Sequence, residues 1–171
     1  MHTRTQGFSL IELMTTLVIA SSLTLTALPS FLALKQKIRS QTHVSKVQSF
    51  IQLGRNHALT YGKPVTICHL ENNRCDNNWQ LGMTAFFDSG TRNQLDGDDK
   101  IIKVFEAFPT QDIAYYNRKA IRFKIDGFAS GTNGTFRYCP DTNTSPHSRA
   151  VIVNQAGRVR FSTAKKIECK S

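Results

Sequence analysis

The chain has 171 residues and a formal net charge of +10, with 22 Lys and Arg against 12 Asp and Glu. This length allows an anchor helix of about 50 residues followed by one compact domain of roughly 110 residues with its own core. The sequence has neither a G-x-S-x-G or similar nucleophile motif nor a C-x-x-C metal motif. We therefore expect no enzyme activity, no cofactor and no metal site.

The N-terminal stretch G-F-S-L-I-E-L-M, residues 7–14, follows a short basic leader. After Glu12 no charged residue appears until Lys35. The uncharged run, residues 13–34, has the length of roughly 20 residues that an apolar helix needs to cross a bilayer. A secretory signal peptide would share these features, but residues 27–29 fit a signal peptidase site poorly. Glu12 is expensive in a membrane helix, about 2.5 kcal/mol or more at its centre, so it needs a partner or a function.

G-F-S-L-I-E-L-M resembles the class III leader of type IV pilins and type II secretion pseudopilins. The resemblance implies a leader of residues 1–7, cleavage by a prepilin peptidase between Gly7 and Phe8, and methylation of the new N-terminal Phe8. It gives Glu12 the role of neutralising the N-terminal amine of a neighbouring subunit during assembly. It also implies a single-pass protein of the bacterial inner membrane, with its domain in the periplasm, which joins other pilin subunits in a pilus at the cell surface. The alternative is an ordinary single-pass anchor with an incidental glutamate.

One long helix is expected over residues 8–61, with a transmembrane and assembly half, residues 8–34, and an amphipathic half, residues 35–61. Pro29 should kink or locally melt it, and Gly62 lies where it should end. The amphipathic half has one apolar face at helical spacing, which we expect to pack on the domain: Val44, Val47, Ile51, Gly54 and Ala58.

Short strands separated by turn residues are expected in the remaining β-rich globular domain, residues 62–171. The fold class is therefore α+β: a long N-terminal helix packed on a C-terminal antiparallel sheet or sandwich. The expected strands are residues 65–70, 79–87, 101–105, 113–116, 120–125, 134–139, 150–153 and 158–161.

The stretch W-Q-L-G-M-T-A-F-F-D, residues 79–88, with the acidic loop D-G-D-D, residues 96–99, is similar to the globular domain of the GspH/FimT pseudopilins. Residues 121–123 and the Gly-rich turn before Phe136 fit as well, so the resemblance covers nearly the whole chain and implies a pilin-like fold. The carboxylates of this loop, counted from Asp88 to Asp99, invite a calcium site but lack the spacing of an EF-hand, and Asp-Gly-Asp is common in simple turns. Calcium binding by this loop stays an open question.

The four cysteines, Cys68, Cys75, Cys139 and Cys169, permit three pairings. Export on a membrane anchor favours disulfides, and the spacings are poor for zinc. Cys68 and Cys75 are close enough to join a strand to a loop, and Cys139 would hold the C-terminal segment through Cys169. We favour these two pairs, although the sequence leaves the connectivity open.

Positive charge is concentrated in the C-terminal part, where residues 118–171 carry 11 basic and 3 acidic side chains. This suggests a polyanionic partner, such as nucleic acid, anionic lipid or acidic polysaccharide, or merely a soluble basic surface. Within it, a hairpin turn should end at Gly157, followed by Arg158 and Arg160 on one face of a strand, about 6.7 Å apart. Val159 and Phe161 should face the other way. Two such guanidiniums suit phosphate oxygens, and an amphipathic edge strand is the alternative.

G-R-x-R near the C-terminus resembles the motif that FimT minor pilins use to bind DNA in natural transformation (competence). The resemblance implies DNA contact at Arg158 and Arg160, with Gly157 in the turn, and charge adds Lys165, Lys166 and Lys170 as supporting contacts. Binding through the phosphate backbone should lack sequence preference, and the sequence leaves open whether single or double strands are favoured. The alternative function is a structural pseudopilin that primes or caps a type IV pilus or a type II secretion pseudopilus.

Overall fold

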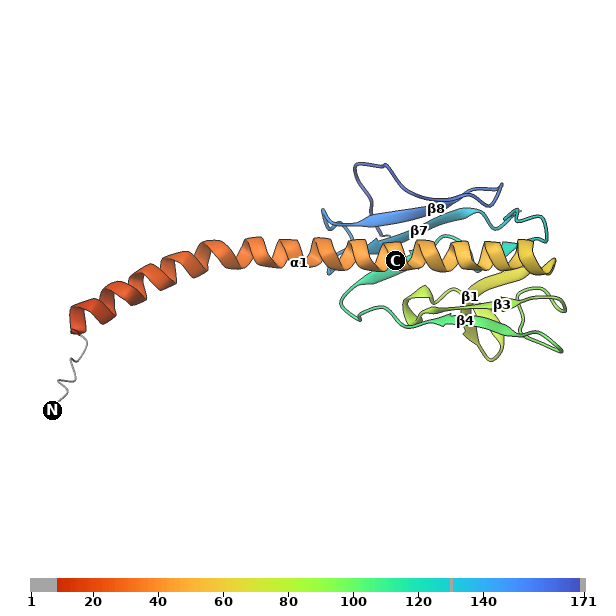
Figure 1. Ribbon diagram of the computed structural model, residues 1–171, viewed down its shortest axis with the longest axis horizontal. Coiled ribbons are helices and arrows are strands. Elements are labelled where there is room, and N and C mark those ends of the chain that lie inside the picture. The colour runs from red at the N-terminus through yellow and green to blue at the C-terminus, as the bar shows by residue number, and fades with distance from the viewer. Residues whose placement is uncertain (1–8, 130, 170–171) are drawn as a thin grey trace, which may run out of the picture. The chain divides into compact units, whose positions relative to one another are not determined.

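The computed structural model describes residues 9–129 and 131–169 (Figure 1). The chain divides into two compact units, residues 1–37 and 38–171. Helix α1 (Leu10–Tyr61) contributes to both. It ends at Tyr61, as the glycine that follows predicts, and it continues through Pro29, so the predicted local melting does not occur.

In the first unit, the described side chains of α1 are mostly apolar and nearly all exposed. Leu10, Leu17 and Phe31 are 79%, 61% and 65% exposed. By length and composition this helix can cross a membrane: its most apolar window has a mean hydropathy of 1.9, and none of it is buried in the described protein. Hydroxyl groups in this segment donate to carbonyls of the preceding turn, as Thr16 does to Leu13 O at 2.9 Å. Such bonds satisfy polar side chains without solvent.

The second unit contains two antiparallel sheets that follow the rest of α1 in the chain. One sheet has the order β2-β1-β3-β4, with β6 also paired to β1, and the other has the order β5-β7-β8-β9. The strands are β1 (Val65–Glu71), β2 (Arg74–Asp76), β3 (Met83–Phe87), β4 (Ile101–Phe105), β5 (Ile113–Tyr116), β6 (Ile121–Phe123), β7 (Gly134–Cys139), β8 (Arg149–Val153) and β9 (Val159–Phe161). This arrangement confirms the predicted α+β fold class.

The core lies where α1 meets the inner faces of both sheets. In Figure 1 the C-terminal part of α1 runs between the sheet with β7 and β8 and the sheet with β1, β3 and β4. The predicted apolar face is confirmed, because Val44, Val47, Ile51 and Ala58 are fully buried. The remaining member, Gly54, gives Ile67 room: a Cβ at Gly54 would lie 2.7 Å from Ile67 Cδ1.

The strand expected over residues 120–125 is only Ile121–Phe123, and two larger differences concern β2 and β3. β2 is an additional strand, which pairs with the end of β1 from Glu71 to His69. The expected strand over residues 79–87 begins only at Met83, because a 3-10 turn, η1 (Trp79–Leu81), precedes it. This turn buries the indole of Trp79, whose Nε1 donates to Arg118 O at 3.0 Å.

Candidate functional site

A tight hairpin joins β8 to β9 and carries the two candidate arginines. Asn154 N donates to Arg158 O at 3.1 Å, and Gly157 N donates to Asn154 O at 3.0 Å. The side chain of Asn154 closes the turn a third time, because its Oδ1 accepts from Arg158 N at 2.8 Å. Gly157 has φ +74°, in the left-handed region that favours glycine. We call residues 154–161 the arginine hairpin.

The turn of the arginine hairpin packs directly against a neighbouring loop and α1. Ala129 N donates to Gln155 O at 3.0 Å. A Cβ at Gly157 would lie 1.8 Å from Gly127 O, so the two backbones touch. Arg55 of α1 donates from Nε to the same Gly127 O at 3.2 Å. These contacts fix the base from which the arginines project.

Both candidate guanidiniums are accessible. Arg158 and Arg160 are exposed, whereas Val159 between them is 8% exposed and joins the core. Among the described residues, neither arginine forms an ion pair with a carboxylate. Phe161 pairs directly with the buried Val151 and so lies on the inner face of the sheet, but it is 45% exposed rather than buried. It is the last residue of β9, which is an edge strand among the strands that the structure describes.

The lysines predicted to support the arginines differ from one another. Lys165 is exposed in the segment that follows β9. Lys166 is also exposed, but its Nζ lies 2.8 Å from Glu168 Oε1, and this hydrogen bond raises the pKa of Lys166. Lys170 lies outside the described residues. The structure therefore leaves Lys165 as an exposed cation in the segment that follows the arginine hairpin, and it pairs Lys166 within its own segment.

Arg137 is a cation on this sheet that the sequence analysis did not select. In β7, Phe136 and Tyr138 are fully buried, so Arg137 between them points to the outer face. There it lines a shallow cavity of about 540 Å³ together with Tyr115 and Ile152. Ile152 pairs directly with Arg160. The alternation of aromatic and polar residues along β7 could have identified Arg137.

The C-terminal segment is held against the same sheet by a disulfide. Cys139 of β7 is bonded to Cys169, with 6.1 Å between their Cα atoms. Cys169 N also donates to Asn143 O at 3.0 Å. The second disulfide joins Cys68 to Cys75, so the structure has the two pairs that the sequence favours.

The buried carboxylate of Asp112 connects parts of the scaffold. Asp112 has a fully buried side chain and pairs with Arg39 of α1 at 2.7 Å. It also accepts hydrogen bonds from the Tyr138 hydroxyl and, at 3.1 Å, from Asp141 N. Burial, together with this hydrogen bond to Asp112, raises the pKa of Tyr138. The ion pair thus connects α1 to the sheet that carries the arginine hairpin.

The residues of the acidic loop do not converge on one point. Asp88 is buried and pairs with Arg122, whose Nε lies 3.0 Å from Asp88 Oδ2. Asp96 and Asp99 accept hydrogen bonds from loop backbone amides, such as that of Ser89 to Asp99 at 2.9 Å. Within the described part of the chain, no group of three or more His, Cys, Asp or Glu is arranged to hold a metal ion. These carboxylates organise the loop.

The processing and assembly residues lie at the other end of the chain. Glu12 is exposed in the first turn of α1, where a carboxylate is favourable to the helix dipole. Gly7 and Phe8, the predicted cleavage site, lie outside the described residues.

A family comparison covers most of the second unit. The sequence model described as Type II transport protein GspH matches residues 43–157. This chain belongs to the GspH family. A prokaryotic N-terminal methylation motif matches residues 2–28 of the GspH-family chain. These matches make it a pilin or pseudopilin, a class of structural subunits that are not enzymes.

Solved structures show the same fold. Two crystal structures of the type IV minor pilin FimU from Pseudomonas aeruginosa strain PAO1 are similar to this GspH-family chain. The form in space group P21 has a TM-score of 0.57 and 17% identity, covering 72% of this chain and 87% of FimU. The form in P65 has a TM-score of 0.55 and 18% identity, covering 71% and 91%. No curated protein matches the chain significantly.

Proposed function

We propose that this GspH-family chain is a FimT-like minor type IV pilin that binds DNA without sequence preference and supports DNA uptake in natural transformation. Arg158 and Arg160 make the principal phosphate contacts, Gly157 sets the turn that presents them, and Lys165 adds charge. Lys166 adds a further phosphate contact once its ion pair with Glu168 opens. In this proposal Lys170 is a supporting contact as well. Arg137 continues the positive surface across the outer face of the sheet.

The methylation motif supports the steps that precede binding. In this proposal residues 1–7 are removed by a prepilin peptidase after Gly7, and Phe8 becomes the methylated N-terminus. Residues 8–34 hold the precursor in the inner membrane, and Glu12 then pairs with the amine of a neighbouring subunit. Residues 35–61 support the periplasmic domain, residues 62–171, which reaches the cell surface in the pilus.

One observation carries the DNA proposal: a hairpin fixed by backbone contacts presents two exposed guanidiniums without a carboxylate partner among the described residues. Arginine can grip phosphate oxygens in a bidentate manner, and these contacts read no base. A site of about 2–5 such contacts is weak alone, so several subunits along a fibre would strengthen binding.

The test is a gel shift and a fluorescence anisotropy titration of duplex DNA with the full-length protein in detergent. Arg158→Ala/Arg160→Ala should weaken binding and lower the log–log salt slope by about 1.8, because each phosphate contact contributes ~0.9. The matched control is Arg74→Ala/Arg92→Ala, which removes two exposed arginines from the other sheet and its loops. Equal retardation of wild type and the Arg158/Arg160 variant would rule out the site.

The second candidate is a structural pseudopilin that primes or caps a fibre and contacts no nucleic acid. One observation favours it: the GspH match ends at residue 157, just before both arginines. Deletion of the gene separates the two functions. Loss of pili or of secretion with intact transformation supports the structural role. Competition for the hairpin by heparin but not by DNA would instead indicate an acidic polysaccharide.

A further inference from the structure

β4 is an edge strand with an exposed apolar surface. Within the part of the chain that the structure describes, it pairs with β3 alone. Ile101 and Val104 are 52% and 59% exposed. A strand of sequence I-I-K-V-F with free backbone groups is a template for another strand and an aggregation hazard when it is left uncovered. We therefore expect this edge to be covered by another chain in the assembled protein.

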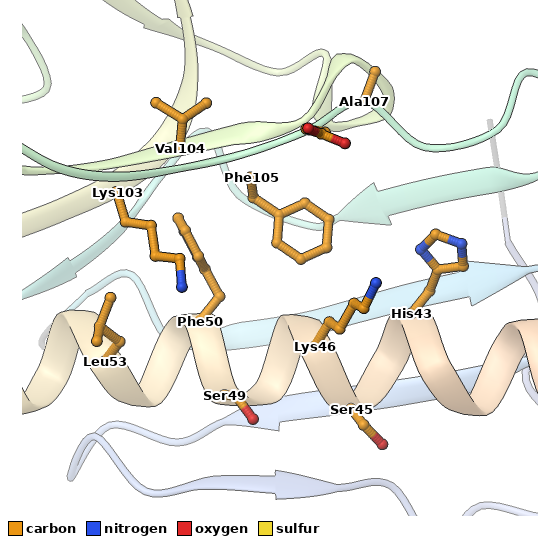
Figure 2. A pocket seen from close by; sticks show the side chains of 11 residues that line it. His43, Ser45, Lys46, Ser49, Phe50, Leu53, Lys103, Val104, Phe105 and Ala107 are labelled. Carbon is orange, nitrogen blue, oxygen red and sulfur yellow. The ribbon is translucent and has the colours of Figure 1, made fainter.

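A groove of about 680 Å³ runs between β4 and α1 (Figure 2), and we call it the α1–β4 groove. Its walls include Lys46, Ser49 and Leu53 of α1. From β4, Lys103 extends towards the helix in Figure 2, because it pairs with the buried, inward-facing Ala85. A strand added to the edge of β4, about 4.8 Å away, would place its inward side chains beside these groups.

The charge of the α1–β4 groove indicates which kind of segment can bind there. Lys46 and Lys103 line it together with one carboxylate, Glu106. Among the described residues neither lysine forms an ion pair. Burial lowers the pKa of His43 below its usual 6.5, so this side chain of the groove is neutral at pH 7. The excess of positive charge favours a segment that brings a carboxylate.

Lys103 argues against pairing between the β4 strands of two copies of this chain. An antiparallel β4–β4 pair would bring the two Lys103 side chains to the same face, and like charges in close cross-strand positions are destabilising. We propose that the α1–β4 groove is a docking site for an extended, carboxylate-bearing segment of a different protein subunit. This segment adds to the free edge of β4 and places its carboxylate near Lys46 and Lys103.

A peptide of matching chemistry tests the proposal on the full-length protein in detergent. The probe is fluorescein-labelled TVEVTV, and the controls are TVKVTV and TVEVTV with N-methylated valines. We expect TVEVTV to bind, the lysine peptide to bind roughly tenfold more weakly, and the N-methylated peptide to lose binding. Lys46→Glu/Lys103→Glu should reverse the preference between the first two peptides, whereas Lys63→Glu/Lys119→Glu, at exposed lysines outside the groove, should not.

Hydrogen exchange locates the peptide without a variant. TVEVTV should slow amide exchange in residues 101–105, and Arg158→Ala/Arg160→Ala should bind it as wild type does. Absence of binding at about 1 mM peptide overturns the proposal. Equal binding of the glutamate and lysine peptides, or protection confined to β5 or β9, overturns it as well.

Discussion

Replacing Gly157 with alanine tests whether backbone contact holds the arginine hairpin. The added Cβ would lie 1.8 Å from Gly127 O and 2.8 Å from Arg55 Nε. The φ of +74° costs about 1–2 kcal/mol for a residue with a Cβ. Since the nearest atom belongs to a backbone carbonyl, no side-chain rotation relieves the clash. The turn must shift and lose its hydrogen bond from Ala129, a further ~1 kcal/mol. We expect the free energy of unfolding to fall by about 2–3 kcal/mol.

Gly131→Ala is the matched control, because Gly131 has φ +76° and no atom of the described residues lies within 4 Å of the added Cβ. It should lose only the conformational part, about 1–2 kcal/mol. Urea unfolding can be followed by the fluorescence of Trp79, the single tryptophan, which is 1% exposed. With a slope of ~2 kcal/mol per M, the lost hydrogen bond of ~1 kcal/mol should place the midpoint of Gly157→Ala roughly 0.5 M below that of the control. Equal midpoints would refute the reasoning.

Three further predictions concern the scaffold. Asp112→Ala should lower the free energy of unfolding by about 2 kcal/mol, because it removes the buried acceptor of Arg39 and of the Tyr138 hydroxyl while Arg39 keeps its ion pair with Asp141; a loss under ~1 kcal/mol in the urea titration would contradict this. Burial raises the pKa of Tyr116 above its usual 10.0. The contribution of Tyr116 to the free energy of unfolding is therefore complete below pH 10.0 and is lost as the pH rises towards the raised pKa. Tyr116→Phe should therefore flatten the fall in stability between pH 10.0 and about pH 11, and an unchanged pH profile would argue against it. Cys139→Ala/Cys169→Ala opens a loop with a sequence separation of 30 and should cost about 3.6 kcal/mol; loss of the other disulfide, with a separation of 7, should cost about 2.4 kcal/mol, and the reverse order would contradict the loop argument.

Periodicity made much of the fold predictable. The face that includes Val44 and Ala58 repeats at helical spacing over residues 44–58, and each turn contributes to the same core. The turn before Arg158 was also predictable, since Asn154 and Gly157 are residue types that the backbone geometry of tight turns favours. Local signals of this kind depend on neighbours in sequence, so the sequence alone expresses them.

Features that depend on residues distant in the sequence could not be predicted from the sequence alone. β2 is three residues long and gains its partner from the end of β1, so it leaves no alternating pattern. Phe161 has the right parity to face inward, but its exposure depends on its place at the edge of the sheet. Asp112 looks like an ordinary loop residue until Arg39, 73 positions earlier, is brought against it. The outer face shared by Arg137 and the arginine hairpin depends on strand order, which spacing does not specify.

The disulfide between Cys139 and Cys169 has a mechanical consequence for the arginine hairpin. Residues 158–161 lie inside the covalent ring that this bond closes, so neither flank of the hairpin is a free chain end. A polymer pulling on the guanidiniums cannot peel β9 away as a loose terminal strand. Tension divides between β8 on one flank and the disulfide-anchored segment on the other, and both paths return to β7.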